Sequence, residues 1–98
     1  STPSPIASSK TIANVTVNYY LDHYRYVPDD YELSEEDRIW GQQPGNYIGY
    51  GSESIEETSV AFLSWSAGGI YYSIMDSDSS ESPEFLFSMA EELINNAK

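Results

Sequence analysis

The sequence predicts a small α+β domain, in which an antiparallel sheet of about four strands, including a hairpin over residues 58–75, is packed by one C-terminal helix over about residues 83–96. Two observations support this fold class. Apolar segments rich in β-branched and aromatic residues flank Gly68-Gly69, which is a strong hairpin signal. After the hairpin, apolar residues recur at helical spacing. With 98 residues, of which 40% are hydrophobic, the chain has enough apolar mass for one core.

The N-terminal part of the chain divides into a tether and the start of the sheet. Residues 1–10 are rich in Ser, Thr and Pro and are predicted to form a flexible tether, which leaves residues 11–98 as a single domain. Valine and tyrosine are interleaved with asparagine and threonine over residues 13–20, so a strand is expected there. Residues 21–26 are ambiguous, and a turn is expected at Val27-Pro28-Asp29-Asp30.

The middle of the chain gives weaker signals. Ser34 and Asp37 match the Ser-x-x-Asp pattern of a capped helix, but no sustained apolar period follows and Gly41 interrupts the segment. A loop or a brief strand is therefore predicted over residues 37–40. A short strand is predicted over residues 46–50.

The parity of the hairpin predicts which of its residues face the core. A two-residue turn at Gly68-Gly69, or a four-residue loop over residues 66–69, gives two separate faces, whereas a three-residue loop would mix them. The face that has no charge and only one hydroxyl is expected to meet the core, and the face that mixes apolar residues with serines is expected to be partly solvated. The expected core face holds Ala61, Leu63, Trp65, Ile70, Tyr72 and Ile74, and the mixed face holds Val60, Phe62, Ser64, Tyr71, Ser73 and Met75.

The C-terminal helix has a recognisable start. Ser82 is the predicted N-cap, and Pro83 suits the first turn of a helix. One apolar stripe is expected to cover the core face of the hairpin. The stripe consists of Phe85, Leu86, Met89, Ala90, Leu93 and Ile94.

Net charge argues against two classes of partner. Sixteen Asp and Glu residues face only four Lys and Arg residues, which gives a net charge of −12. Such a charge repels nucleic-acid phosphates and anionic lipid head groups, so no nucleic-acid partner is expected. No run approaches the ~20 apolar residues that span a bilayer, so direct membrane insertion of this chain is not expected either. The chain has no cysteine, which excludes disulfides and Cys-ligated zinc.

The residues predict no catalytic, cofactor or metal site. His23 is the only imidazole and has neither a cysteine nor a second histidine with which to bind a metal. Asp76 and Asp78 have the first two ligand spacings of a calcium loop, but Glu81 stands where such a loop requires Gly, and Phe87 where it requires a bidentate Glu. Calcium binding by this acidic loop is left open. The hypothesis of a small hydrolase would apply only if the fold brought His23 together with a serine and an acid in one pocket.

Three segments resemble elements of a bacterial extracytoplasmic domain family of unknown function. Residues 26–33 look like its P-x-G-Y-x-L element, with Asp30 in place of the usual Gly. Residues 60–75 are similar to its V-x-W-x-x-x-G-x-x-Y hairpin, and residues 85–94 resemble its closing E-x-L-x-x-A-x-x-I helix. Members occur in Gram-positive anti-sigma-factor-like membrane proteins and in lipoproteins. The resemblance therefore implies an extracytoplasmic domain that a preceding anchor tethers to the cell membrane, and it implies no catalytic residue set.

The preferred functional hypothesis is a non-catalytic sensory or interaction domain of a membrane-anchored regulator or lipoprotein. Its expected partner is a protein or a cell-envelope component, and its candidate partner surface is the mixed sheet face at Phe62, Tyr71 and Met75. The alternative hypothesis is a cell-wall or carbohydrate-binding module, because exposed Tyr and Trp rings stack on the apolar faces of sugars.

Overall fold

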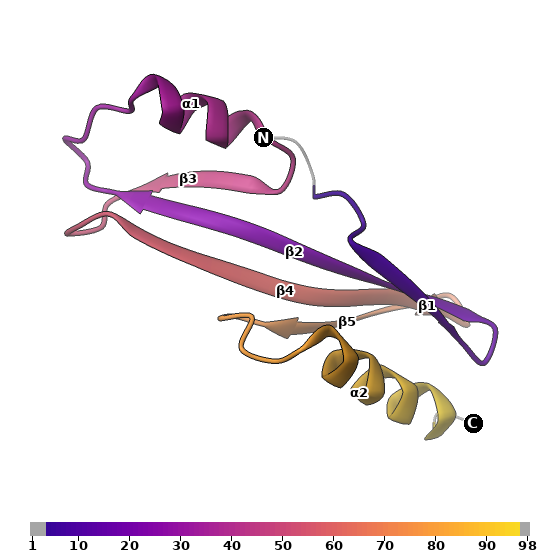
Figure 1. The fold of residues 1–98 in the computed structure, drawn as a ribbon. Helices are drawn as coiled ribbons and strands as arrows, with labels where there is room; N and C mark the ends of the chain where they lie inside the picture. Colours follow the sequence, from indigo (N-terminus) through magenta and orange to yellow (C-terminus); the bar gives the residue numbers. More distant parts are fainter. Residues whose placement is uncertain (1–3, 97–98) are drawn as a thin grey trace.

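The computed structural model describes residues 4–96, which form a five-stranded sheet and two helices (Figure 1). The α+β class predicted from the sequence is confirmed. The molecule is elongated, with extents of 53 × 22 × 22 Å, because two long strands run along most of its length. The strands are β1 (Ser8–Ile12), β2 (Val15–Val27), β3 (Asn46–Tyr50), β4 (Glu56–Ala67) and β5 (Ile70–Asp76), and the helices are α1 (Glu35–Gln42) and α2 (Pro83–Asn96).

Four strands form an antiparallel sheet in the order β1-β2-β4-β5, and β3 joins it as a parallel neighbour of β2. Because β4 occupies one edge of β2, β1 and β3 share the other edge, where β1 pairs with residues 15–19 and β3 with residues 23–27. The connection through α1 is long enough to return the chain in the parallel direction. The predicted antiparallel arrangement therefore holds for every strand except β3.

The sheet begins earlier in the chain than the sequence predicted. Ser8, Ser9 and Lys10 pair with Tyr19, Asn18 and Val17, so the tether predicted over residues 1–10 is too long at its C-terminal end. Of that predicted tether, residues 1–3 lie outside the described residues. The strand predicted over residues 13–20 is also longer than expected, because β2 continues through the ambiguous segment to Val27.

The helix α1 corrects the prediction of a loop or brief strand over residues 37–40. A capping box starts this helix: Ser34 Oγ accepts a hydrogen bond from the Asp37 backbone N–H at 3.1 Å, and the Asp37 carboxylate accepts one from the Ser34 N–H at 2.9 Å. The apolar period was too short to indicate a helix, but the cap was a valid signal. Gly41 lies against Ile48 of β3, where a Cβ atom would come within 2.9 Å of that side chain.

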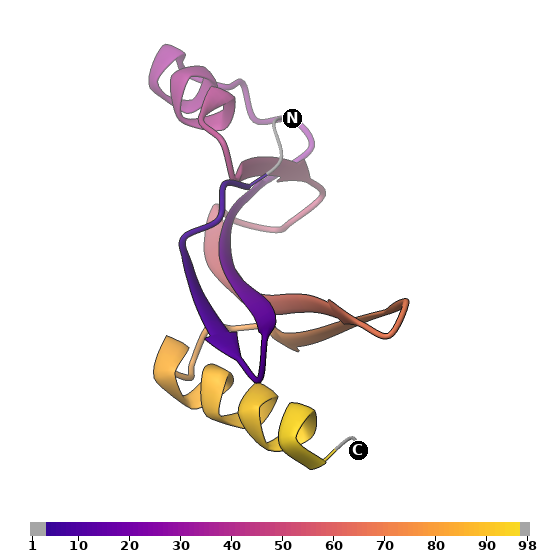
Figure 2. The same ribbon diagram turned by 90° about the vertical axis from the view of Figure 1, so that its right-hand side faces the viewer.

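The hairpin has the two-residue turn, which is one of the two loops that keep the predicted faces. Gly68 and Gly69 have φ angles of 59° and 79°, and Ala67 pairs with Ile70, so both predicted faces are present. Ala61, Leu63 and Trp65 are buried as expected, whereas Ile70 and Tyr72 at the far end of the hairpin are exposed. The end of the hairpin reaches away from both helices (Figure 2), so neither helix of the described residues covers Ile70 and Tyr72.

The N-cap of α2 is Ser82, as predicted, because Ser82 Oγ accepts a hydrogen bond from the Phe85 N–H at 3.1 Å. The predicted apolar stripe is wrong for half of its members. Phe87 is buried and its ring lies 6.3 Å from that of Tyr19, whereas the exposed members of the predicted stripe are Phe85, Met89 and Leu93. The helix is thus rotated about its axis relative to the expected orientation. The core consists of Ile12, Val17, Tyr19, Ala61, Leu63, Trp65, Leu86, Phe87 and Ala90.

Candidate functional site

The two faces of the sheet differ in what covers them. The helix face carries α2 over Val17, Tyr19 and Leu63, and α1 over Arg25 and Ile48, with the two helices at opposite ends of the molecule (Figures 1 and 2). No helix of the described residues packs on the other face, called here the open face. Side chains on the open face include Tyr20, Asp22, Tyr24, Tyr26, Tyr47, Val60, Phe62, Tyr71, Ser73 and Met75.

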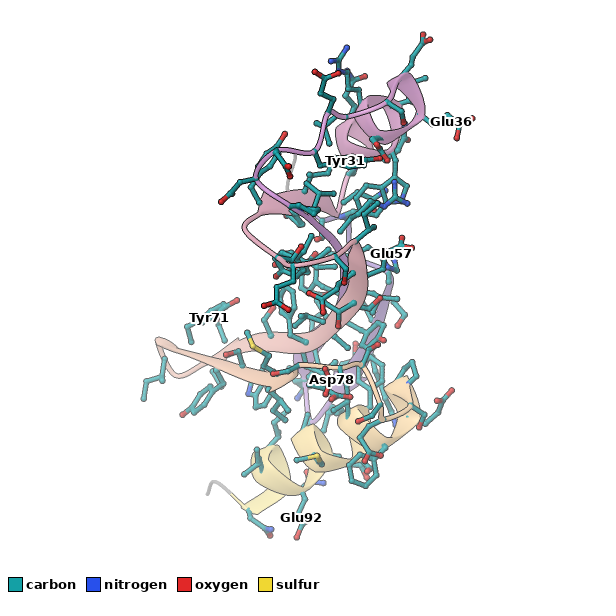
Figure 3. The ribbon with its side chains drawn as sticks, turned by 90° about the vertical axis from the view of Figure 1, so that its left-hand side faces the viewer. Tyr31, Glu36, Glu57, Tyr71, Asp78 and Glu92 are labelled. Atoms are coloured by element: carbon teal, nitrogen blue, oxygen red, sulfur yellow. The ribbon has the colours of Figure 1, made fainter. Side chains whose placement is uncertain are left out.

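The candidate partner surface predicted from the sequence lies on the open face. Phe62 and Met75 are paired across β4 and β5, and Tyr71 follows on the same side of β5, nearer the turn. Tyr71 is 69% exposed and Met75 is 70% exposed, while Phe62 is half-buried against Tyr20. Figure 3 shows Tyr71 on the side of the hairpin that faces away from α2. The three residues therefore form one accessible surface.

Tyrosines from β2 and β3 extend this surface along the sheet, and the sequence analysis missed them. The rings of Tyr24 and Tyr47 are stacked with centroids 5.1 Å apart, and the rings of Tyr24 and Tyr26 are stacked with centroids 6.1 Å apart. Farther along, Tyr20 stacks with Phe62 at 4.8 Å. A signal was present, since Tyr20, Tyr24 and Tyr26 all stand at even positions of one strand.

Ring orientation limits what this surface can bind. The stacked pairs have interplanar angles between 7° and 21°, so each ring in a pair lies nearly parallel to its neighbour, which limits access to the ring faces. Sugar stacking needs an accessible ring face. Trp65 is buried and stacked with Tyr72, and one face of Trp40 is covered by the Arg25 guanidinium at 4.2 Å. The aromatic residues available for sugar stacking are therefore fewer than the composition indicated.

Asp22 introduces a buried acid among these tyrosines. Its side chain is on the open face, flanked along β2 by Tyr20 and Tyr24, and its Oδ1 is buried with no hydrogen-bond partner among the described residues. Burial raises the pKa of Asp22, and the neighbouring His23 opposes that shift. Burial also raises the pKa of Tyr24, with a further contribution from the negative charge of Asp22. Asp22 is thus an acid whose charged form is disfavoured by its buried position on the open face.

On the helix face, Arg25 organises a polar cluster that holds α1 on the sheet. Its guanidinium donates hydrogen bonds to Asp37 at 3.0 Å and to Glu57 at 3.0 Å. Asp37 also accepts from Tyr31 Oη at 2.8 Å. Hydrogen bonds, first from the Ser34 backbone and then from Tyr31, lower the pKa of Asp37 to about 2. These contacts are consistent with a structural cluster, since every charged group in it already has a partner.

Next to this cluster lies a shallow cleft of about 530 Å³ whose lining includes His23, Trp40, Glu57 and Ser59. His23 Nδ1 and Ser59 Oγ are 3.0 Å apart, so the fold does join the histidine to a serine. A hydrolytic triad also needs an acid bound to the imidazole. The acid in this cleft, Glu57, is instead bound by Arg25. The contact has the geometry of a cross-strand polar pair, since His23 and Ser59 stand opposite each other in β2 and β4.

Hydrogen bonds within the acidic connection between β5 and α2 engage the carboxylate of Asp76. The Asp76 carboxylate accepts from the Glu81 N–H at 2.8 Å and from Ser80 Oγ at 3.3 Å. Over residues 4–96, no group of three or more His, Asp or Glu side chains is arranged to hold a metal ion.

Comparison with protein-family models, with curated proteins and with solved structures finds no match to this chain. Neither helix of the described residues has both the length and the apolarity that crossing a membrane requires. The resemblance over residues 26–95 to an extracytoplasmic family therefore stays a prediction.

Proposed function

We propose that this domain is a non-catalytic interaction module that binds a partner protein through the open face of its sheet. The observation that carries the proposal is the contrast between the two faces. Both helices pack on one face, while the other displays aromatic and apolar side chains that include the highly exposed Tyr71 and Met75. Contiguous exposed apolar surface on a small domain is typical of an interaction site.

The proposed setting is outside the cytoplasm, in a membrane-anchored regulator or a lipoprotein whose anchor precedes this domain. The resemblance of residues 26–95 to domains from such proteins supports this setting. A net charge of −12 supports a partner surface that is basic around an apolar centre.

A photo-crosslinking experiment tests the proposal. The photoreactive amino acid p-benzoylphenylalanine is placed at Tyr71 on the open face, and at Glu92, an exposed position on α2, as the control (Figure 3). We expect a discrete crosslinked product in native cells from position 71 and none from position 92. Added wild-type domain should compete for the product, whereas the Met75→Glu variant should compete at least tenfold less well, because it places a charge in the apolar surface.

Equal crosslinking from both positions, or competition that Met75→Glu does not change, would contradict the proposal. The carbohydrate-binding alternative is tested separately by NMR titration with peptidoglycan fragments and oligosaccharides. Saturable shifts of the Trp40 indole signal and of the Tyr71 amide would favour that alternative. No shifts at millimolar concentrations of these sugars would remove it.

A further inference from the structure

The outer edge of β5 lies next to the candidate partner surface. β5 is the last strand in the order β1-β2-β4-β5, and no strand of residues 4–96 pairs with its outer side. In a two-residue hairpin the residues that flank the turn, here Ala67 and Ile70, form a hydrogen-bonded pair, and such pairs alternate along the ladder. The N–H and C=O groups of Tyr71, Ser73 and Met75 therefore point away from β4.

This edge lacks the features that usually prevent strand addition. Protected edges carry Lys, Pro or a bulge, or are covered by another element. The opposite edge strand, β1, fits this rule, since Lys10 forms an ion pair with Glu91 of α2 at 3.5 Å. Between Ile70 and Met75, by contrast, β5 has no charge and no proline, and it pairs in continuous register with β4.

Apolar surface borders this edge on both sides. On the open face, Tyr71 and Met75 flank Ser73. On the helix face, an apolar groove of about 560 Å³ lies between the hairpin and the end of α2, with Tyr72 and Leu93 among its lining residues. A strand placed beside β5 would bury apolar side chains at alternate positions on both faces.

We propose that β5 is the docking edge for an extended segment of a partner protein, which carries Lys or Arg among alternating apolar residues and joins the sheet as an additional strand. This inference rests on the proposed function, because Tyr71 and Met75 belong to the same partner surface. Only an extended backbone satisfies the unpaired N–H and C=O groups of Tyr71, Ser73 and Met75 in sequence.

Charge determines the expected composition of the partner segment. The connection that follows β5 exposes Asp78 and Glu81, and α2 begins with the exposed Glu84. A segment that runs past this end of β5 gains from Lys or Arg there. A second copy of this chain is the less favourable occupant, because each copy carries a net charge of −12 and would bring its own acidic connections to the interface.

The test uses the whole chain, labelled with ¹⁵N, and three short synthetic peptides. The first alternates Val and Thr and has Lys at both ends. The second has Glu in place of Lys, and the third is the Lys peptide with alternate backbone amides N-methylated. With the Lys peptide we expect saturable shifts of the Tyr71, Ser73 and Met75 amides, and hydrogen exchange at these amides slowed by about tenfold or more. The Glu and N-methylated peptides should bind at least tenfold more weakly.

Two variants with a matched design test the backbone contact on the protein side. Ser73→Pro removes an outward N–H, which an edge strand tolerates, and Ser73→Thr keeps it. We expect Ser73→Pro to lose tenfold or more in affinity for the Lys peptide, and Ser73→Thr to bind as the wild type does. If Ser73→Pro does not fold, the N-methylated peptide still makes the same distinction.

Three results would overturn the strand-addition proposal. The first is binding of the N-methylated peptide as tight as that of its parent. The second is the absence of shifts with the Lys peptide at millimolar concentration. The third is sedimentation that shows dimers which Ser73→Pro dissociates, because this result would assign the edge to a second copy. In each case the crosslinking result at Tyr71 decides the proposed function independently. If position 71 gives a discrete crosslinked product and the Met75→Glu variant fails to compete for it, the open face remains the proposed binding site, but the partner does not bind as an added strand.

Discussion

The guanidinium of Arg25 in β2 and the carboxylate of Asp37 in α1 lie 3.0 Å apart, and this ion pair fastens the short helix to the sheet. The same carboxylate accepts hydrogen bonds from Ser34 and Tyr31. The Arg25 guanidinium also covers the ring of Trp40. An eight-residue helix is marginal by itself, so these tertiary contacts explain how α1 persists with so few apolar residues.

The first prediction concerns acid stability. Because the pKa of Asp37 is about 2 in the folded chain, below its ordinary value of 3.8, the stability that this carboxylate contributes is present in full at neutral pH. That contribution is lost as the pH falls through the window from about 3.8 to about 2. In Asp37→Asn, the free energy of unfolding should be lower at pH 7 and should change less across this window than in the wild type. Urea unfolding at a series of pH values measures both quantities.

The exposed neighbour of Asp37 in the same helical turn provides the control. Glu36 makes no hydrogen bond or ion pair within the described residues, and Figure 3 shows its side chain pointing outward from α1. Glu36→Gln should therefore leave the free energy of unfolding at pH 7 within about 0.5 kcal/mol of the wild type. A pH dependence that Asp37→Asn and Glu36→Gln reduce equally would count against the special role of Asp37.

The second prediction distinguishes the observed orientation of α2 from the one that its apolar pattern indicated. Phe87 is 7% exposed and packs on Tyr19, while Phe85 is 47% exposed. Phe87→Ala should lower the free energy of unfolding by about 3 kcal/mol or more. Phe85→Ala should change it by no more than about 0.5 kcal/mol. Urea unfolding at pH 7 measures both variants, and a larger loss from Phe85→Ala would show that the helix orientation described here is wrong.

The sequence predicted the hairpin and the start of α2 correctly because each depends on local chemistry. The Gly68-Gly69 turn fixed the parity of β4 and β5, and with it the common face of Phe62, Tyr71 and Met75. The orientation of α2 was missed because consecutive apolar residues, Phe85 to Phe87, allow more than one stripe. Only packing against Tyr19 selects between them. The parallel pairing of β3 was similarly invisible, since it depends on α1 returning the chain alongside β2.

The candidate site was predicted in part for a related reason. Phe62, Tyr71 and Met75 were found because a strong turn fixed their register. The tyrosines of β2 were missed because Asp22, His23 and Arg25 interrupt the apolar alternation of that strand. The structure explains these interruptions, since Arg25 bonds to acids on the helix face and Asp22 is buried on the open face. Polar residues that serve tertiary contacts therefore concealed a strand of thirteen residues.

The third prediction concerns the buried carboxylate of the open face. Because burial raises the pKa of Asp22 above its ordinary value, the folded chain disfavours the charged form, and a cost in stability appears as the pH rises through that raised pKa. Asp22→Asn keeps a polar group at this position but removes the charge that burial disfavours, so it should raise the free energy of unfolding at pH 7 by about 1 kcal/mol. Urea unfolding at pH 7 and pH 3 measures the change, which should shrink at the lower pH. A lower stability of Asp22→Asn at pH 7 would indicate that the carboxylate has a favourable partner.

The fourth prediction tests the turn that sets the register of the proposed docking edge. Gly68 and Gly69 both have positive φ angles, and an added Cβ at either would meet no atom within 4 Å, so any effect of substitution is conformational and not steric. Gly69→Ala should lower the free energy of unfolding by about 1–2 kcal/mol, because alanine disfavours the left-handed region. Gly68→Asn should stay within about 0.5 kcal/mol of the wild type, because Asn-Gly is a preferred pair for this two-residue turn. Thermal and urea unfolding of the two variants measure these costs. Equal costs would contradict the assigned turn, because a longer loop would not distinguish Asn at the first position from Ala at the second.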